Sequence, residues 1–424
     1  MTLQTVTTSL YNVPRITQWP LSHIAFVAGC LLYGLYSVPT PDNPGVVEII
    51  IATLLGISII ASGALKLFSF VSLSNQRPYW MHAGITFMAF AITVPVITGI
   101  VHGNGGLAII RDLIGLMFWL LPVFFAVSVF DKQKSADFCS IVTFSITAIG
   151  VLFSIRFLIS LLAVTEKLTL APAHPDIYLE LVNVPSVLFA ALYLTGHGLR
   201  KLQYDFRDKI TGMIYLFIGC LPVIAGISAL QRANMGSLFI LLFCLIAIQI
   251  YFRHKRSIWA LIVLSIAITA IYPLLSDVIS LMIEKTRLVG FNMRFEEANA
   301  ILNHMARYSG SFFLGLGWGA SFLSPAAGFI EINFTHNFFM TLWLKTGIAG
   351  LALGSLYVVA LILPIFRQIL SGPTRQTHFI MTLALFLPVI INLLLYANHK
   401  SFDFGLMLLL CALVGHARKA QKSS

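Results

Sequence analysis

A histidine at the start of a long apolar segment is the strongest chemical signal in the sequence. In THNFFMTLWLKTGIAGLALG, residues 335–354, His336 begins a stripe that places positions 336, 340, 343, 347 and 350 on one helical face. The positive end of a helix disfavours the imidazolium form, and a neutral imidazole there is suited to accept a proton. We expect Thr335 or Asn333 to cap this helix. On periodicity alone, His336 could equally be an interfacial side chain that only reaches toward water.

The glycines that follow His336 have a simple structural interpretation. Gly347 and Gly350 lie on the same face as the histidine, and Gly354 lies one turn further along. Small residues at this spacing let another helix approach closely, so these glycines require no catalytic explanation.

Several charged residues lie within apolar segments, where they are energetically costly. Arg156 is near the end of one such segment and could bind a diphosphate or extend toward the membrane surface. Arg111 and Asp112 are adjacent, and mutual neutralisation is the simplest interpretation of that pair. Lys345 faces away from the stripe that begins at His336, and the sequence offers no explanation for it.

The elements that position these residues must lie in lipid. The chain has 424 residues, of which 58% are hydrophobic and only 10% charged, and its mean hydropathy is +0.90. A soluble protein of this length needs more charge to cover its surface. All five cysteines occur in apolar runs without CxxC spacing, so the sequence predicts neither a disulfide framework nor a metal site.

The apolar segments predict an all-α polytopic membrane protein with about twelve transmembrane helices. With the N-terminus in the cytoplasm, only Lys167, Arg232 and Lys400 are basic residues of the short external turns, and the other loops are rich in lysine and arginine. This positive-inside bias places both termini in the cytoplasm and accounts for most of the +11 formal charge. The expected segments are 22–38, 47–71, 80–101, 106–130, 138–164, 177–197, 210–229, 236–252, 257–280, 336–363, 378–397 and 402–417.

One external connection, residues 277–335, is much longer than the others. It contains an amphipathic stretch, EKTRLVGFNMRFEEANAILNHMARYSG, followed by the glycine-rich FLGLGWGASF. The first stretch is typical of a helix that lies at the membrane interface. A long loop with its own structure is usually functional. Without an internal repeat or a low-complexity linker, residues 1–424 are expected to form a single membrane domain that includes this loop.

Motif and topology together resemble a bacterial family. His336-Asn337, nine intervening residues and then Gly347-x-x-Gly350 resemble the HN-x9-GxxG motif of O-antigen ligases, which belong to a superfamily that also contains O-antigen polymerases. The twelve segments, the inward termini, the long external loop and the GLGWG stretch agree with this resemblance.

The resemblance implies an inverting, metal-independent glycosyltransferase of the GT-C type in the bacterial inner membrane, with its active site at the periplasmic face and no cofactor. Its donor would be a glycan on undecaprenyl pyrophosphate, its acceptor lipid A–core, and its role lipopolysaccharide assembly. The family histidine corresponds to His336. One family arginine corresponds to Arg232 in QRANMGSLFILL, although Gln231 replaces the usual serine. A second corresponds to Arg294 in NMRFEEANAIL, with Arg287 and Arg307 as neighbouring candidates for substrate binding.

Independently of the family resemblance, the chemistry of glycan transfer requires these residue types. Pyrophosphate gains negative charge as it leaves, and the planar guanidinium group of arginine can bind its oxygens and stabilise that charge. The acceptor hydroxyl is a poor nucleophile until a base removes its proton, which would be the role of His336. Asn337 would hold a sugar hydroxyl, and Arg156 could reach the diphosphate. His336 could instead bind the pyrophosphate.

Three other interpretations of the sequence stay open. A polymerase that joins lipid-linked repeat units would share the motif. A twelve-helix transporter or flippase would share the topology, but such proteins usually show related halves and acidic residues at mid-membrane. Glu296 and Glu297 are paired carboxylates in the long loop and could provide a carboxylate base or a divalent-cation site.

Overall fold

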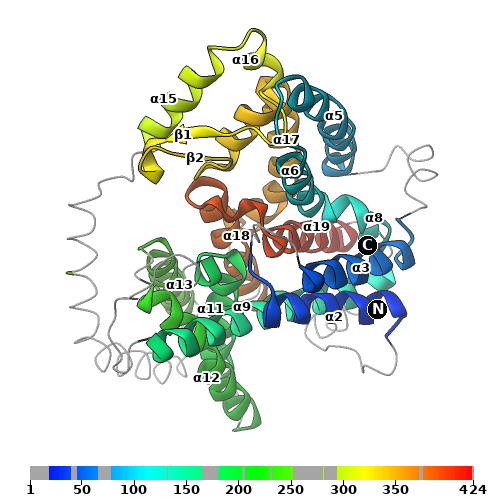
Figure 1. Cartoon of the computed structure of the whole chain (residues 1–424). Coiled ribbons are helices and arrows are strands. Elements are labelled where there is room, and N and C mark those ends of the chain that lie inside the picture. The colour runs from blue at the N-terminus through cyan, green and yellow to red at the C-terminus, as the bar shows by residue number, and fades with distance from the viewer. Residues whose placement is uncertain are drawn as a thin grey trace.

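The computed structural model describes residues 19–39, 45–64, 78–130, 132–164, 180–202, 206–229, 232–251, 280, 294–371 and 376–422. This part of the chain is mostly helical, with one short hairpin at one end of the molecule (Figure 1). The helices are α2 (Leu21–Tyr36), α3 (Val46–Ala61), α5 (Tyr79–Val101), α6 (Gly106–Trp119), α7 (Leu121–Phe124), α8 (Ala126–Phe130), α9 (Lys132–Val164), α11 (Pro185–Lys201), α12 (Phe206–Ser228), α13 (Arg232–Tyr251), α15 (Arg294–Met305), α16 (Ser311–Leu314), α17 (Phe338–Leu370), α18 (Gln376–Leu394) and α19 (Phe402–Lys422). The hairpin consists of β1 (Phe322–Ser324), the 3-10 turn η3 (Pro325–Ala327) and β2 (Ile330–Ile332), and a second 3-10 turn, η4 (Ala397–Lys400), joins α18 to α19.

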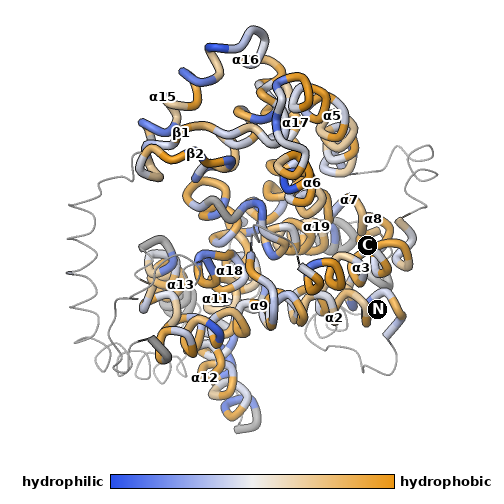
Figure 2. Tube along the Cα trace, viewed as in Figure 1, coloured by the Kyte–Doolittle hydropathy of each residue, from blue (hydrophilic) through white to orange (hydrophobic). Residues whose placement is uncertain are grey.

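Within the described residues, four helical stretches are long and apolar enough to cross a bilayer. Shorter apolar helices accompany them, and Figure 2 shows apolar residues along most of the bundle. The chain is therefore a helical membrane protein. The four stretches are Tyr79–Val101, Ser135–Leu162, Asp208–Ser228 and Phe338–Leu370.

Most of the segments expected from the sequence coincide with helices, with one clear exception. Residues 106–130, expected as a single span, form three consecutive helices, α6, α7 and α8. Pro122 lacks the N–H that would continue the helical hydrogen bonds, and the backbone at Leu120 and Phe125 leaves helical geometry. Gly405 of α19 lies beside this break, where an added Cβ would be 2.4 Å from the Phe118 carbonyl oxygen. The expected segment 257–280 lies outside the described residues apart from position 280.

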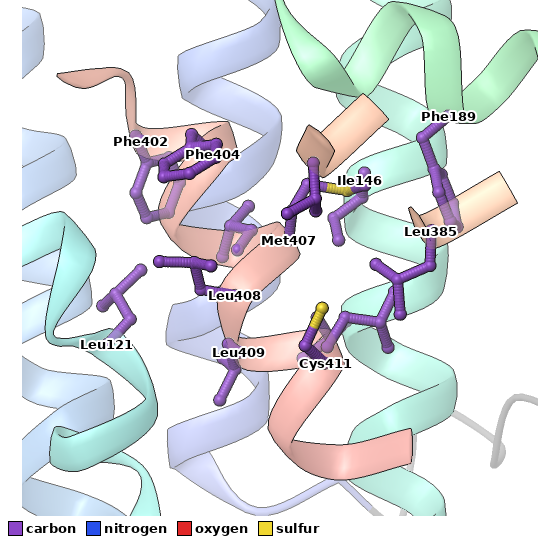
Figure 3. Close-up of a cluster of buried hydrophobic side chains, with 14 of the residues drawn as sticks. Leu121, Ile146, Phe189, Leu385, Phe402, Phe404, Met407, Leu408, Leu409 and Cys411 are labelled. Carbon is purple, nitrogen blue, oxygen red and sulfur yellow. The ribbon is translucent and has the colours of Figure 1, made fainter. Parts of the chain in front are cut away.

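The core of the bundle is organised around α19. Most side chains from Phe402 to Leu413 are completely buried, which is the pattern of a helix surrounded on all sides by other helices. Figure 3 shows this helix between Leu121 of α7, Ile146 of α9, Phe189 of α11 and Leu385 of α18.

Residues 294–335 form a small cap on one end of the bundle, drawn in yellow in Figure 1. Its strands are antiparallel, with Phe322 opposite Ile332 and Ser324 opposite Ile330. Ile301, Met305, Leu316, Phe322, Ile332 and Leu344 form a separate small core that packs α15 and the hairpin onto α17. The amphipathic pattern in this part of the sequence is confirmed for α15, which buries Ile301 and Met305 and exposes Glu296.

Candidate functional site

His336 lies between strand β2 and helix α17, at the junction of the cap with the bundle. The helix cap is Asn337, so the expectation of Thr335 or Asn333 is wrong. The side-chain oxygen of Asn337 accepts hydrogen bonds from the amides of Phe339 (2.9 Å) and Met340 (3.4 Å). Thr335 supports this cap, because its hydroxyl donates to the Asn337 carbonyl oxygen at 2.6 Å. His336 therefore precedes the helix and is followed by an N-cap residue with an extended backbone.

Glu297 of α15 holds the imidazole ring of His336. Nδ1 of His336 lies 3.1 Å from Oε1 and 3.3 Å from Oε2 of Glu297, and the backbone N–H of His336 also donates to Oε2 at 3.3 Å. Ser324, at the end of β1, donates its hydroxyl to Oε1 at 3.1 Å. The Glu297 side chain is 4% exposed and that of His336 is 32% exposed. One nitrogen of the ring is therefore held by a buried carboxylate, while part of the ring faces outward.

The surroundings of Glu297 favour its ionised form. Burial alone would raise the pKa of this carboxyl, but the hydrogen bonds and charge of His336, together with the Ser324 hydroxyl, bring the pKa below its ordinary value of 4.5. An ionised carboxylate only accepts hydrogen bonds, so it selects the tautomer in which Nδ1 of His336 carries the proton. Nε2 of a neutral His336 then has a free electron pair.

The glycine-rich segment 315–319 docks the cap onto α17 at a break in that helix. Gly347 has φ +63°, and the break leaves carbonyl groups of the preceding turn without helical partners. The amides of Leu316 and Gly317 donate to the Leu344 and Lys345 carbonyl oxygens at 2.8 and 2.9 Å. A Cβ at position 347 would lie 2.2 Å from the Phe313 carbonyl oxygen. Gly347 thus permits both the positive φ and the close approach of the short helix α16.

The same segment also binds α5, at a proline inside that helix. Pro95 cannot donate to the carbonyl of Ala91. The indole N–H of Trp318 donates to that carbonyl at 2.7 Å, and the Trp318 amide donates to the Pro95 carbonyl at 2.9 Å. The side-chain amide of Asn104 donates to the carbonyls of Leu316 and Trp318 at 3.0 and 2.8 Å. The cap is therefore held at the break in α17 and at the carbonyl that Pro95 leaves free in α5.

Gly350 and Gly354 act as the sequence predicts, by allowing close helix packing. An added Cβ at Gly350 would be 2.9 Å from Phe90, and one at Gly354 would be 3.1 Å from Phe87. Both phenylalanines belong to α5, so the later glycines of the motif bring α5 against α17.

A second charged cluster lies beside the glycine-rich segment. Asp112 of α6 forms ion pairs with Lys345 of α17 and Lys400 of η4, the latter at 2.8 Å. Its Oδ2 also accepts the Gly319 amide at 2.7 Å, and Lys400 donates to the Asn333 carbonyl at 3.0 Å. Both Asp112 and Lys345 are fully buried. The structure thus supplies the explanation of Lys345 that the sequence lacks, and it gives Asp112 two lysine partners that are distant in sequence.

The structure describes the side chains of only some of the predicted arginines. Arg156 donates to the carbonyls of Gly34 and Ser37 at 3.0 and 2.6 Å, which ties α9 to the end of α2. Among the described contacts, none joins Arg156 to the His336–Glu297 pair. Arg307 is exposed, two residues after α15 ends.

Arg232 and Arg294 are the first residues of α13 and α15, but their side chains lie outside the described part of the structure. Arg287 lies entirely outside the described residues. Arg294 is one helical turn before Glu297, so the predicted arginine and the carboxylate that holds His336 belong to the same short helix. The catalytic roles predicted for Arg232 and Arg294 stay predictions.

Sequence reasoning missed the role of Glu297 as the partner of His336, and it missed Ser324. Glu297 was recognisable as half of a carboxylate pair in the long loop, but it is 39 residues from His336, and only the fold of the cap joins them. Ser324 carried no signal in the sequence. No group of three histidine, cysteine or acidic side chains suited to a metal ion occurs among the residues that the structure describes. Comparison of the chain with protein-family models and with curated proteins gives no match.

Proposed function

We propose that this protein is an O-antigen ligase, an inverting, metal-independent glycosyltransferase. It would move a polymeric glycan from undecaprenyl pyrophosphate to a sugar hydroxyl of lipid A–core in lipopolysaccharide assembly. The observation that carries the proposal is the His336–Glu297 pair, in which a buried carboxylate holds one ring nitrogen and leaves the other for a substrate. The substrate class is the one implied by the resemblance of the HN-x9-GxxG pattern to that of O-antigen ligases.

The transfer is a single displacement at the anomeric carbon. Nε2 of His336 accepts the proton of the acceptor hydroxyl as its oxygen forms the new bond to that carbon. The bond between the carbon and the pyrophosphate oxygen breaks, and pyrophosphate leaves with the electron pair. Glu297 stabilises the imidazolium that results, as an orienting carboxylate does in other histidine bases. Attack opposite the leaving group inverts the configuration.

The remaining roles follow from what each side chain can offer. Arg232 and Arg294 would stabilise the developing charge of the pyrophosphate, with Arg287, Arg307 and Arg156 as further phosphate contacts. The side-chain oxygen of Asn337 is used by the helix cap, so contact with a sugar hydroxyl would come from its Nδ2. No metal or other cofactor would take part.

The proposed function implies a particular topology. Twelve spans of a GT-C-like bundle would cross the bacterial inner membrane, with both termini in the cytoplasm. The whole chain would be one membrane domain, and the loop at residues 277–335 would carry the active site at the periplasmic face. The four long apolar helices and the shorter ones support this arrangement, and the cap places His336 at one end of the bundle.

A reconstituted transfer assay tests the proposal. Purified protein in liposomes receives undecaprenyl-pyrophosphate-linked glycan as donor and lipid A–core as acceptor, with EDTA present. We expect glycan–lipid A–core conjugate from the wild-type protein and none from His336→Ala. Donor that grows longer without conjugate would identify a polymerase. Donor that crosses the membrane chemically unchanged would identify a transporter or flippase.

A second substitution separates the two roles open to His336. If the histidine bound pyrophosphate as a cation, His336→Arg would keep a large part of the activity, because arginine binds phosphate oxygens well. A base must lose a proton near neutral pH, which arginine does not do in proteins. We therefore expect His336→Arg to be as inactive as His336→Ala.

A further inference from the structure

The short helix α16 exposes a row of large apolar side chains. Phe312, Phe313 and Leu314 are 46%, 63% and 44% exposed, although they occur in a loop that the sequence predicts to be external. The ring of Phe312 meets Trp343 of α17 edge to face, with ring centroids 5.4 Å apart, so the row is fixed against a membrane helix. Adjacent exposed aromatic residues in a rigid position indicate an apolar partner.

The attachment of α16 lies within the length of the membrane helices rather than beyond their ends. Its following residues bond to the carbonyls of Leu344 and Lys345, whereas α17 begins at Phe338. At 1.5 Å per residue, this contact is about 10 Å along the helix axis. On α5, the contact falls at Pro95 and Gly99, before that helix ends at Val101.

The exposed row continues an apolar surface of the two helices that hold it. On α5, near the contact, Ile97, Ile100 and Val101 are 60%, 65% and 76% exposed. On α17, Ile348 lies next to the break at Gly347 and is 40% exposed. Since both helices are long and apolar enough to span a bilayer, these side chains are suited to contact acyl chains.

Non-helical structure inside a membrane requires that its polar groups be satisfied by protein, and the amides of residues 313–319 meet this requirement. The amide of Gly315 donates to the Ser311 carbonyl at 2.7 Å, and the next three amides donate to carbonyls of α17 and α5. The carbonyls of Leu316 and Trp318 accept from Asn104.

We propose that residues 311–319 form a re-entrant segment that enters the leaflet on the cap side of the membrane. Phe312, Phe313 and Leu314 contact lipid acyl chains, and the glycine-rich stretch returns through the protein interior. The long loop is therefore not wholly external. The His336–Glu297 pair lies close to the lipid headgroups as a consequence, which suits a site whose substrates are lipid-linked, but the inference does not depend on the proposed reaction.

Spin-label accessibility tests the inference directly. Cysteine is placed at Phe313, Ile97 or Asn303 in full-length protein whose five native cysteines are replaced by alanine. Each variant is labelled and reconstituted in phosphatidylethanolamine–phosphatidylglycerol liposomes. Ile97 is the lipid-facing control on α5, and Asn303 is an exposed polar residue of α15. Collision rates with oxygen, which concentrates in lipid, and with a water-soluble nickel chelate are then compared.

We expect the label at position 313 to behave like that at position 97, with high oxygen and low nickel accessibility, and unlike the label at position 303. Nickel accessibility at position 313 equal to that at position 303 would overturn the proposal. If the labelled Phe313→Cys protein does not elute as a folded species, Phe313→Trp in liposomes with brominated acyl chains gives the same answer. Added quenching relative to the wild-type protein supports insertion, and unchanged quenching contradicts it.

Discussion

Two charged groups lie where the cap meets the bundle, and they differ in how much of each group is exposed. The Asp112–Lys345–Lys400 cluster is almost completely buried, and the Asp112 carboxylate is occupied by two ammonium groups and the Gly319 amide. The His336–Glu297 pair also contains a buried carboxylate, that of Glu297, but its histidine side chain is 32% exposed. Charges in a membrane helix usually indicate function, yet the first group only ties α6, α17 and η4 together. Partial exposure of a well-oriented group, rather than charge itself, distinguishes the site.

The largest effect is expected on folding stability, when the charge of the buried cluster is unbalanced. Asp112→Asn leaves two buried lysines without a counter-charge, which should destabilise the protein by about 3–5 kcal/mol. Lys345→Met leaves Asp112 paired with Lys400 and the Gly319 amide, so it should cost much less. Thermal unfolding in detergent measures both variants. Equal losses from the two substitutions would contradict the structural role assigned to Asp112.

The next effect concerns the break that lets the cap dock. Gly347→Ala forces a non-glycine residue into φ +63° and places a Cβ 2.2 Å from the Phe313 carbonyl, so we expect a loss of roughly 2–4 kcal/mol in stability. Gly56→Ala in α3 is the matched control, because nothing lies within 4 Å of an added Cβ there. The control should be neutral or stabilising by up to about 1 kcal/mol. Similar melting temperatures for both variants would show that the break is not required.

A smaller effect on stability, but a clear one on rate, is expected at Glu297. Glu297→Gln removes the charge that orients His336 and should lower the rate of glycan transfer by roughly 10²-fold while the protein stays folded. Glu296→Gln is the control, since Glu296 is exposed on the same helix. Initial rates in the liposome assay measure both. A Glu297→Gln protein as active as the control would remove Glu297 from the site.

The smallest effect is a pH dependence of stability. Because the folded protein lowers the pKa of Glu297 below 4.5, its ionised form stabilises the fold. This contribution is complete above the unfolded value and is lost as the pH falls through the lowered folded pKa. The difference in melting temperature between wild type and Glu297→Gln should therefore shrink as the pH falls below about pH 4. A difference that grows on acidification would have the wrong sign.

The contrast between the two groups also shows how far the sequence could lead. Hydropathy predicted the helices because apolar length is a local property, and the position of His336 before a span was local too. Glu297 reaches His336, and Ser324 reaches Glu297, only through the fold of the cap, in which α15 packs against β1. Lys345 looked anomalous because its partner, Asp112, lies on α6, 233 residues before it. Gly347 was expected to admit a helix, and α16 does approach it, but no local signal predicted the break that this glycine makes in α17.

We propose that Glu297 acts on the transfer reaction only through His336. Combining a substitution of each residue in one protein tests this proposal. Transfer rates are measured for His336→Gln, Glu297→Gln and the combination of both, in liposomes with EDTA. Residues that act as one unit are strongly non-additive. We predict that the double variant is no slower than His336→Gln alone. If the two losses multiply, Glu297 has a separate role and the pair is not a single catalytic unit.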